Sequence, residues 1–328
     1  MKILITCPNM INTINDYKDI LSRYNFDYFC PKFEQTLSEN QLLDLIGNYD
    51  AWIIGDDPAT KKVFQKGKSG KLKVAMKWGV GTDNVDFKAC DELNIPINNT
   101  PQMFGEEVSD VAIGYLLCLT RKLHLINNEN LKGNWFKPLG NSLSNKKVCL
   151  IGFGDIGRCI ARKLFVFNLN VYTYDPGFEI INNKIVCKFD DSIIVDDLLQ
   201  KVKLNNLDTC LDNSDYIIVA CPLNKNTKYL LNKEKILKSK KGVYIINISR
   251  GGIINENDVN ELQENEFING IAFDVFENEP LDKNHNLKKF PQNMFGSHNG
   301  SNTIEAVNKV SLLCIEKIYQ YFKENEFK

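Results

Sequence analysis

Three glycines in mid-chain have the spacing needed to hold a dinucleotide. Residues 147–157 read KVCLIGFGDIG, so that Gly152, Gly154 and Gly157 form a G-x-G-x-x-G pattern between an apolar strand and the helical sequence RCIARKLF. The first glycine allows a tight turn, the second lets the backbone approach a pyrophosphate, and the third lets helix and strand pack closely. The amides of Asp155 and Ile156 open the helix, whose positive end favours phosphate.

The next strand, NVYTYD, ends in Asp175. A carboxylate at this place accepts hydrogen bonds from the ribose hydroxyls of the adenosine and repels a 2′-phosphate. Pro176 and Gly177 follow it and supply no arginine that would accommodate NADP. The pattern therefore predicts NAD as the cofactor.

Short apolar runs alternate with helical patterns along the chain. The runs are rich in β-branched residues, as buried parallel strands are, and they read KILIT, DAWIIG, KKVCLIGFG, NVYTYDP, DYIIVACPL, GVYIINIS and GIAFDVF. This alternation predicts an α/β architecture with right-handed crossovers. Longer apolar patterns at helical spacing predict helices over 106–127 and 303–323. The stretch 178–210 is too long for one crossover and predicts an extra loop or short helix.

The glycine pattern begins only after roughly 100 residues that form a β/α series of their own. We therefore predict a Rossmann-type doubly wound parallel sheet domain over 101–300. It would be inserted into a second, flavodoxin-like α/β substrate domain made of residues 1–100 and 301–328. The active site is expected in the cleft between these two domains.

Composition narrows the class of ligand. A net charge of -1 over 328 residues argues against nucleic acid or an anionic membrane as partner. The start, MKILITCPNM, has too few consecutive apolar residues for a signal peptide, and no run is long enough for a membrane span. The 10 cysteines are scattered without a C-x-x-C pair, and the 3 histidines stand far apart. We expect a cytoplasmic protein with reduced thiols, no metal site and a small-molecule substrate.

From about Trp78 to Ala306 the chain resembles the D-isomer-specific 2-hydroxyacid dehydrogenases, a family that includes phosphoglycerate dehydrogenases. The motifs occur in order as GVGTDNVD, NNTP, EEVSDVAIGYLLCLTRK, IGFGDIG, CPLNKNTKYLLN, INISRGG, GIAFDVFENEP and SHNGSNTIEA. The resemblance implies hydride transfer between NAD(H) and C2 of a D-2-hydroxy acid or 2-oxo acid.

The same resemblance implies that Arg250, in INISRGG, binds the substrate and that His298, in SHNGS, is the acid/base. A guanidinium can hold a carboxylate and polarise a carbonyl, and an imidazole with a pKa near neutrality can move a proton in both directions. His124, in the long helix, and His285, in a polar loop, are weaker candidates for the acid/base.

Glu279, in ENEP, corresponds to the glutamate that pairs with the family's histidine, orients it and raises its pKa by favouring the charged form. Glu277 and Asp282 are alternatives on spacing alone. Glu279 is preferred because it stands directly before Pro280.

Further contacts follow from the resemblance. Four residues would contact the cofactor, with the last of them at the nicotinamide carboxamide: Pro222, Ile248, Ser249 and Asp274. The backbone of Val80 and Gly81 would receive the substrate carboxylate. Lys77 and Trp78 stand where phosphoglycerate dehydrogenases often carry an arginine for the substrate phosphate. The lysine could serve a phosphate as a point charge, and the tryptophan would narrow the pocket.

The chain departs from the family around its histidine. Ser297 precedes His298 where a proline is usual, and residues 299–301 read NGS where an apolar residue and two glycines are usual. We expect the histidine to keep its role while the local contacts to the cofactor differ.

The substrate stays open at this point, with D-3-phosphoglycerate, glycerate, glyoxylate and lactate all candidates. Alternatives within enzymes are a glyoxylate/hydroxypyruvate reductase or a relative that oxidises formate or phosphite. An NAD-sensing binding protein resembling a co-repressor could use the same scaffold. The long apolar helix over 106–127 suggests a homodimer.

Overall fold

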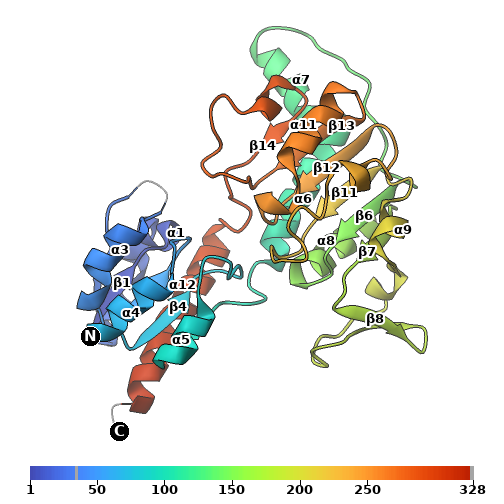
Figure 1. Ribbon diagram of the computed structural model, residues 1–328. Helices are drawn as coiled ribbons and strands as arrows, with labels where there is room; N and C mark the ends of the chain where they lie inside the picture. The colour runs from blue at the N-terminus through green and yellow to red at the C-terminus, as the bar shows by residue number, and fades with distance from the viewer. Residues whose placement is uncertain (34–35, 326–328) are drawn as a thin grey trace. The chain divides into compact units, whose positions relative to one another are not determined.

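The computed structural model describes residues 1–33 and 36–325. The chain divides into two compact units, which are treated separately below. Unit 1 comprises Met1–Met103 and Asn302–Lys328, and unit 2 comprises Phe104–Ser301. The last three residues of the range predicted for the outer domain lie outside the described part of the chain. Figure 1 labels the main elements of both units.

Unit 1 contains one parallel sheet of five strands in the order β2-β1-β3-β4-β5. This is the strand order of flavodoxin-like folds, as the sequence predicts. The strands are β1 (Lys2–Ile5), β2 (Asp27–Phe29), β3 (Ala51–Ile54), β4 (Val74–Lys77) and β5 (Ile97–Asn98). The helices are α1 (Pro8–Asn12), α2 (Lys18–Arg23), α3 (Glu39–Leu45), α4 (Lys61–Ser69), α5 (Phe87–Leu93) and α12 (Ile304–Asn325).

Helix α12 returns the end of the chain to unit 1, and the predicted helix over 303–323 is confirmed with its end two residues further on. Thr303 precedes it, and its side-chain oxygen accepts a hydrogen bond from the Ala306 amide at 3.1 Å, as a capping threonine does. Ala306, Val310 and Cys314 follow one another at intervals of one helical turn and are buried.

Unit 2 is built on a parallel sheet of seven strands in the order β10-β7-β6-β11-β12-β13-β14. Strands β6 and β11 are neighbours in the middle of this sheet, and later strands are added outward on both sides of the pair. This reversal of direction is the switch point of a Rossmann-type sheet. The strands are β6 (Lys147–Ile151), β7 (Asn170–Tyr174), β10 (Lys203–Leu204), β11 (Tyr216–Val219), β12 (Val243–Asn247), β13 (Ile268–Phe273) and β14 (Met294–Phe295). The helices are α6 (Gly105–Arg121), α7 (Leu123–Leu131), α8 (Asp155–Val166), α9 (Leu207–Leu211), α10 (Lys233–Ile236) and α11 (Glu256–Glu264).

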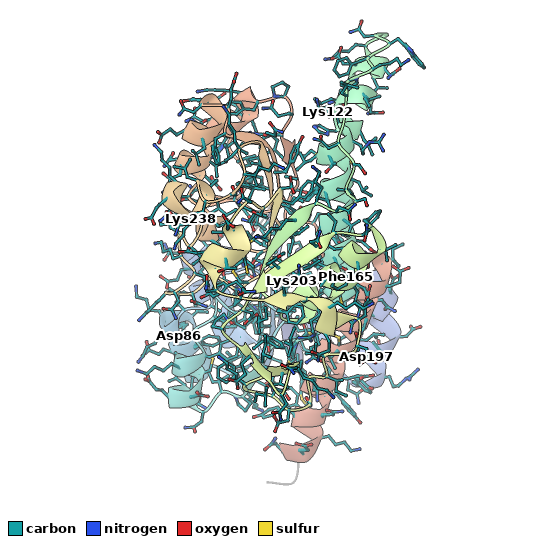
Figure 2. The ribbon with its side chains drawn as sticks, turned by 90° about the vertical axis from the view of Figure 1, so that its right-hand side faces the viewer. Asp86, Lys122, Phe165, Asp197, Lys203 and Lys238 are labelled. Carbon is teal, nitrogen blue, oxygen red and sulfur yellow. The ribbon has the colours of Figure 1, made fainter. Side chains whose placement is uncertain are left out.

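The prediction of one continuous helix over 106–127 is wrong at Lys122. This residue takes the left-handed conformation, with φ of 57°, and divides the run into α6 and α7. Figure 2 shows the helical ribbon continuing past Lys122. Helix α7 has no buried residue, and Leu123 is 47% exposed. The apolar pattern therefore continues beyond the break, although none of the residues of α7 is fully buried.

The stretch 178–210 contains an antiparallel hairpin where an extra loop or short helix was predicted. Strands β8 (Phe178–Ile181) and β9 (Lys184–Cys187) pair only with each other. Asn182 and Asn183 join them, and both have positive φ, of 49° and 62°. A two-residue turn with both φ values positive matches the twist of a hairpin, and asparagine tolerates this conformation. The Asn-Asn pair between EII and KIV was the sequence signal for it.

Candidate functional site

The glycine turn follows β6 and has the shape that a pyrophosphate needs. Gly152 has φ of 103°, and a Cβ there would lie 2.7 Å from the Ala220 backbone. A Cβ on Gly157 would lie 2.2 Å from the carbonyl oxygen of Gly152, so helix and strand require glycine at both places. A Cβ on Gly154 would meet no protein atom within 4 Å. The packing of the protein does not require this second glycine, which fits the approach of a ligand to the backbone.

Helix α8 begins directly after this turn, at Asp155, and Gly154 in the N-cap position provides no side-chain cap. The first amides of the helix, including that of Ile156, therefore face the turn, where a phosphate would satisfy them. The turn and the helix together fit a dinucleotide cofactor.

Asp175 directly follows β7, beside the glycine turn. Its Oδ2 accepts a hydrogen bond from the Phe153 amide at 2.6 Å, and its Oδ1 accepts one from the Gly177 amide at 2.7 Å. These two backbone N–H donors fix the orientation of the carboxylate, which accepts hydrogen bonds through both oxygens. Each oxygen has a further lone pair, so the geometry fits the ribose hydroxyls of an adenosine.

Arg250 lies three residues after the end of β12, in a turn shaped by Asn247. The Asn247 side chain is fully buried, donates to the Arg250 carbonyl at 3.0 Å and accepts from the Ser249 amide at 3.1 Å. The Ser249 hydroxyl donates to the Cys221 carbonyl, which ties this turn to the segment after β11. The sequence analysis missed Asn247. A polar amide at the end of the apolar strand VYIIN was the available signal.

His298 lies between the other two predicted catalytic side chains. Its Nδ1 is 2.8 Å from Oε2 of Glu279, and its Nε2 is 3.5 Å from Nη1 of Arg250. Oε1 of Glu279 accepts from the Phe276 amide at 2.9 Å, which fixes the carboxylate. A guanidinium only donates, so these contacts suit the tautomer in which Nε2 accepts and Nδ1 carries the proton toward Glu279. This arrangement can hold an anion beside Arg250 and move a proton at Nε2.

The alternative carboxylates are engaged elsewhere. Glu277 accepts from the Tyr229 hydroxyl at 2.9 Å and from the Glu256 amide at 3.1 Å. Asp282 accepts from the Asn284 amide at 2.6 Å. Neither takes the position of Glu279 beside His298.

The alternative histidines are engaged elsewhere as well. Nε2 of His124 is 3.0 Å from the Gln292 carbonyl oxygen. Nε2 of His285 is 3.1 Å from Oε2 of Glu256. Of the three histidines, His298 therefore has the neighbours that the predicted acid/base needs.

Asp274 directly follows β13 and is 3% exposed. Its Oδ1 accepts from the Tyr115 hydroxyl at 3.1 Å, and its Oδ2 accepts from the Gly300 amide at 2.8 Å. Burial and the Asp274 carboxylate raise the pKa of Tyr115 above its usual range, so its hydroxyl stays a donor at working pH. Sequence reasoning missed Tyr115, because nothing in its helical context distinguishes it from a packing residue.

Pro222 and Ile248 lie at the same edge of the unit 2 sheet. Pro222 follows β11, and its carbonyl accepts from the Thr227 hydroxyl at 2.6 Å. Ile248 follows β12 and is 7% exposed. All the predicted cofactor residues therefore follow the carboxyl ends of parallel strands, where ligands of such sheets bind.

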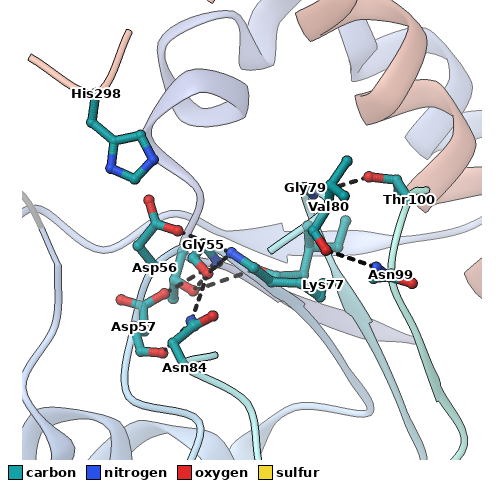
Figure 3. Close-up of polar contacts among 12 residues, drawn as sticks. Gly55, Asp56, Asp57, Lys77, Gly79, Val80, Asn84, Asn99, Thr100 and His298 are labelled. Atoms are coloured by element: carbon teal, nitrogen blue, oxygen red, sulfur yellow. Dashed lines mark hydrogen bonds and ion pairs between the residues drawn. The ribbon is translucent and has the colours of Figure 1, made fainter. Parts of the chain in front are cut away.

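Lys77 is used inside unit 1, as Figure 3 shows. It is 2% exposed, and its Nζ donates to the Gly55 carbonyl at 2.5 Å and to Oδ1 of Asp56 at 3.0 Å. Asn84 donates to the same Gly55 carbonyl at 3.1 Å and to the Asp57 carbonyl at 2.7 Å. The ammonium group thus holds the turn after β3.

The turn over 78–81 follows β4 in the same unit. The Val80 side chain is 39% exposed, and its carbonyl accepts from the Asn99 side chain at 2.9 Å. Gly79 donates to Thr100 at 3.0 Å, so two residues after β5 fix the backbone that leads to Gly81. Trp78 is 6% exposed and its indole N–H donates to Ser311 of α12 at 3.1 Å. The tryptophan therefore packs within unit 1.

Two further properties concern the described residues as a whole. No helix within 1–33 or 36–325 is both long and apolar enough to cross a membrane. In the same ranges, no three histidine, cysteine, aspartate or glutamate side chains converge as metal ligands would.

Comparisons with known proteins show the family of this chain. Residues 113–300 match the family model described as D-isomer specific 2-hydroxyacid dehydrogenase, NAD binding domain. A glyoxylate reductase from Thermofilum pendens is 31% identical, over 77% of this chain and 72% of that protein. A D-3-phosphoglycerate dehydrogenase from Methanocaldococcus jannaschii is 30% identical, over 86% of this chain and 51% of that protein.

A solved structure shares the fold over the full length. The NAD-dependent formate dehydrogenase from Staphylococcus aureus, in complex with NAD, superimposes with a TM-score of 0.82 at 24% identity, over 100% of this chain and 97% of that one. The family model covers more than half of this chain and includes the glycine turn, Asp175, Arg250, Glu279 and His298. The chain belongs to the D-isomer-specific 2-hydroxyacid dehydrogenases, a family of NAD-dependent oxidoreductases.

Proposed function

We propose that the protein reversibly reduces a small, unphosphorylated 2-oxo acid to the 2-hydroxy acid, in the D form where C2 becomes a stereocentre, with glyoxylate and hydroxypyruvate as the first candidates. The observation that carries the reaction type is the contact series Arg250–His298–Glu279, with 3.5 Å and 2.8 Å between the contacting atoms. When bound, NAD(H) supplies or accepts the hydride at C4 of its nicotinamide.

Each side chain has a separate task in this proposal. Arg250 binds the carboxylate and the C2 oxygen of the substrate, which polarises the carbonyl. His298 gives a proton from Nε2 to that oxygen during reduction and takes it back during oxidation. Glu279 orients the ring through Nδ1 and stabilises its charged form. The amides of Val80 and Gly81 receive the substrate carboxylate.

The cofactor residues have tasks of their own. Asp175 binds the ribose hydroxyls, and the glycine turn with the α8 amides binds the pyrophosphate. Pro222, Ile248 and Ser249 contact the cofactor, and Asp274 contacts its nicotinamide carboxamide.

The charges of unit 1 favour an unphosphorylated substrate. Lys77 is buried and bonded to Gly55 and Asp56, so its ammonium group is already used. Arg23 is the single arginine of residues 1–103. It ends α2, which leads back to the amino end of β2, whereas Lys77 ends β4 at the carboxyl edge of the sheet. A phosphate beside Lys77 would therefore meet an ammonium group that is already bonded to Gly55 and Asp56.

Oxidation of NADH with a panel of 2-oxo acids tests the proposal. The panel contains glyoxylate, hydroxypyruvate, pyruvate and phosphohydroxypyruvate. We expect kcat/KM for glyoxylate or hydroxypyruvate to exceed that for phosphohydroxypyruvate by about tenfold or more, since one unmatched charge costs about 1.4 kcal/mol or more in a partly buried site. A clear preference for phosphohydroxypyruvate would refute the substrate class. NADH binding without turnover of any 2-oxo acid would instead indicate an NAD-sensing protein.

We also propose that the protein is a homodimer of the cytoplasm. The last residue of α7 and the segment that follows it expose large apolar side chains, with Leu131 at 80%, Trp135 at 84% and Leu139 at 92%. Apolar groups gathered in this way commonly mark a protein contact, and a second copy would cover them symmetrically. Light scattering should give twice the chain mass, and a variant with Trp135→Ser and Leu139→Ser should give the monomer mass. A monomeric wild type would refute the dimer.

A further inference from the structure

The loop that carries His298 needs more support than its sequence provides. His298 has φ of 55°, in the left-handed region that non-glycine residues rarely adopt. Ser297 precedes it where the family usually has a proline, so the fixed backbone angle of a proline is missing here. Something else must hold the backbone that aims the imidazole at Arg250.

Asp274 provides such support from two of its groups. The His298 amide donates to the Asp274 carbonyl at 2.7 Å, and the Gly300 amide donates to Oδ2 of Asp274 at 2.8 Å. The Gly296 amide donates to the Phe273 carbonyl at 2.8 Å. One residue thus binds both sides of the left-handed position, once through its backbone and once through its carboxylate.

Tyr115 fixes the other oxygen of this carboxylate. It lies on α6, and its hydroxyl donates to Oδ1 of Asp274 at 3.1 Å. A Cβ on Gly296 would lie 2.0 Å from Oδ1 and 2.3 Å from the Tyr115 hydroxyl. The hydrogen bond therefore passes through space that only a glycine at 296 leaves open. With Tyr115 on one oxygen and Gly300 on the other, the carboxylate has a single orientation.

We propose that Tyr115 is a positioning residue for the acid/base reaction: by orienting the Asp274 carboxylate it fixes the backbone of residues 298–300 and thereby aims His298 at Arg250. The inference rests on the proposed role of His298. It assigns the tyrosine hydroxyl a task that a packing residue would not have, because the ring alone would fill the same volume.

Tyr115→Phe removes the hydroxyl and keeps the ring. Tyr216→Phe is the matched control, because the Tyr216 hydroxyl also bonds to α6, at 3.3 Å from Oγ1 of Thr120, without touching Asp274. We expect Tyr115→Phe to lower kcat about tenfold, near the lower end for a lost hydrogen bond to a charged group. The KM for the 2-oxo acid should change less than about twofold, since Arg250 is untouched. The solvent deuterium isotope effect on kcat should rise, because proton transfer becomes slower. The control should show none of these changes.

Hydrogen exchange followed by mass spectrometry provides a second measurement that needs no turnover. Residues 296–301 should exchange faster in Tyr115→Phe than in wild type and in Tyr216→Phe. Equal exchange in both variants would overturn the proposal, and so would faster exchange with an unchanged kcat. If the wild type reduces no 2-oxo acid, the proposed function fails, and the exchange data still decide whether Tyr115 holds the loop.

Discussion

Replacing Glu279 by glutamine tests how much the carboxylate contributes to the acid/base histidine. Oε2 of Glu279 is 2.8 Å from Nδ1 of His298, and Oε1 accepts from the Phe276 amide at 2.9 Å. Glutamine has one oxygen and one NH₂ group. Either the NH₂ group faces the imidazole, which then cannot carry a proton on Nδ1, or it faces the Phe276 amide, which places two donors together.

The size of the effect follows from the hydrogen bond that is lost. A hydrogen bond to a charged group contributes about 1.5–3 kcal/mol, or about one to two decades in rate. The side chains of His298 and Glu279 are 28% and 24% exposed, so water screens part of the interaction. We therefore expect the lower half of that range. At neutral pH, kcat for reduction should fall about 10- to 30-fold.

The assay is the pH profile of NADH-dependent reduction. Reduction needs the charged imidazole, so weakening that form should move the falling limb of the profile toward lower pH by about one unit. Acidification should partly restore the rate of the variant. Glu277→Gln is the control, because Glu277 faces Tyr229 and Glu256 and should leave the limb in place. A profile of Glu279→Gln that coincides with wild type would refute the reasoning.

The remaining predictions concern the cofactor and the framework of unit 2. Asp175→Asn removes a charge that repels a 2′-phosphate, so the ratio of kcat/KM for NADPH over NADH should rise about tenfold or more; an unchanged ratio would remove Asp175 from the ribose site. Gly157→Ala places a Cβ 2.2 Å from a backbone carbonyl oxygen and should lower the free energy of unfolding by about 1–3 kcal/mol, whereas Gly154→Ala, with no atom within 4 Å, should leave unfolding unchanged and raise the KM for NADH. Burial raises the pKa of Asp215, but bonds from Lys240 and a backbone amide outweigh burial and hold that pKa below 3.8. The ionised Asp215 carboxylate therefore stabilises the folded state above pH 3.8, and this stabilisation is lost as the pH falls through the lower pKa of the folded state. Urea unfolding should show Asp215→Asn about 1–2 kcal/mol less stable than wild type at pH 7, with the difference shrinking at pH 3; a constant difference would contradict the assignment.

The parts of the fold that follow from local pattern could be predicted from the sequence. Gly152 and Gly157 could be recognised by their spacing between a strand and a helix. Gly157 is required by a contact with Gly152 in the same βα unit, and Gly152 by its φ of 103° and its contact with the Ala220 backbone. Arg250 and His298 could be identified by the motifs around them, and both follow the ends of parallel strands. The family resemblance supplied the choice of Glu279 over Glu277, which spacing alone leaves open.

The parts that depend on tertiary contacts could not be predicted. Tyr115 is separated by 159 residues from Asp274, and only the folded sheet brings them together. Lys77 ends a buried strand, where a lysine side chain is commonly exposed, yet Gly55 and Asp56 hold it inside. The sequence does not signal the helix break at Lys122, because leucines continue the apolar spacing on both sides of it.

The β8–β9 hairpin has a practical consequence for handling the enzyme. Its strands form a sheet of their own, apart from the seven-stranded sheet, and Asn182 and Asn183 form its tip. A peptide tag or a fluorophore placed at this tip would not shift the alignment of any strand in the seven-stranded sheet, and loop tips of this kind tolerate insertions. The tip therefore offers an attachment point for surface immobilisation or single-molecule work in which the glycine turn and the histidine loop keep their geometry.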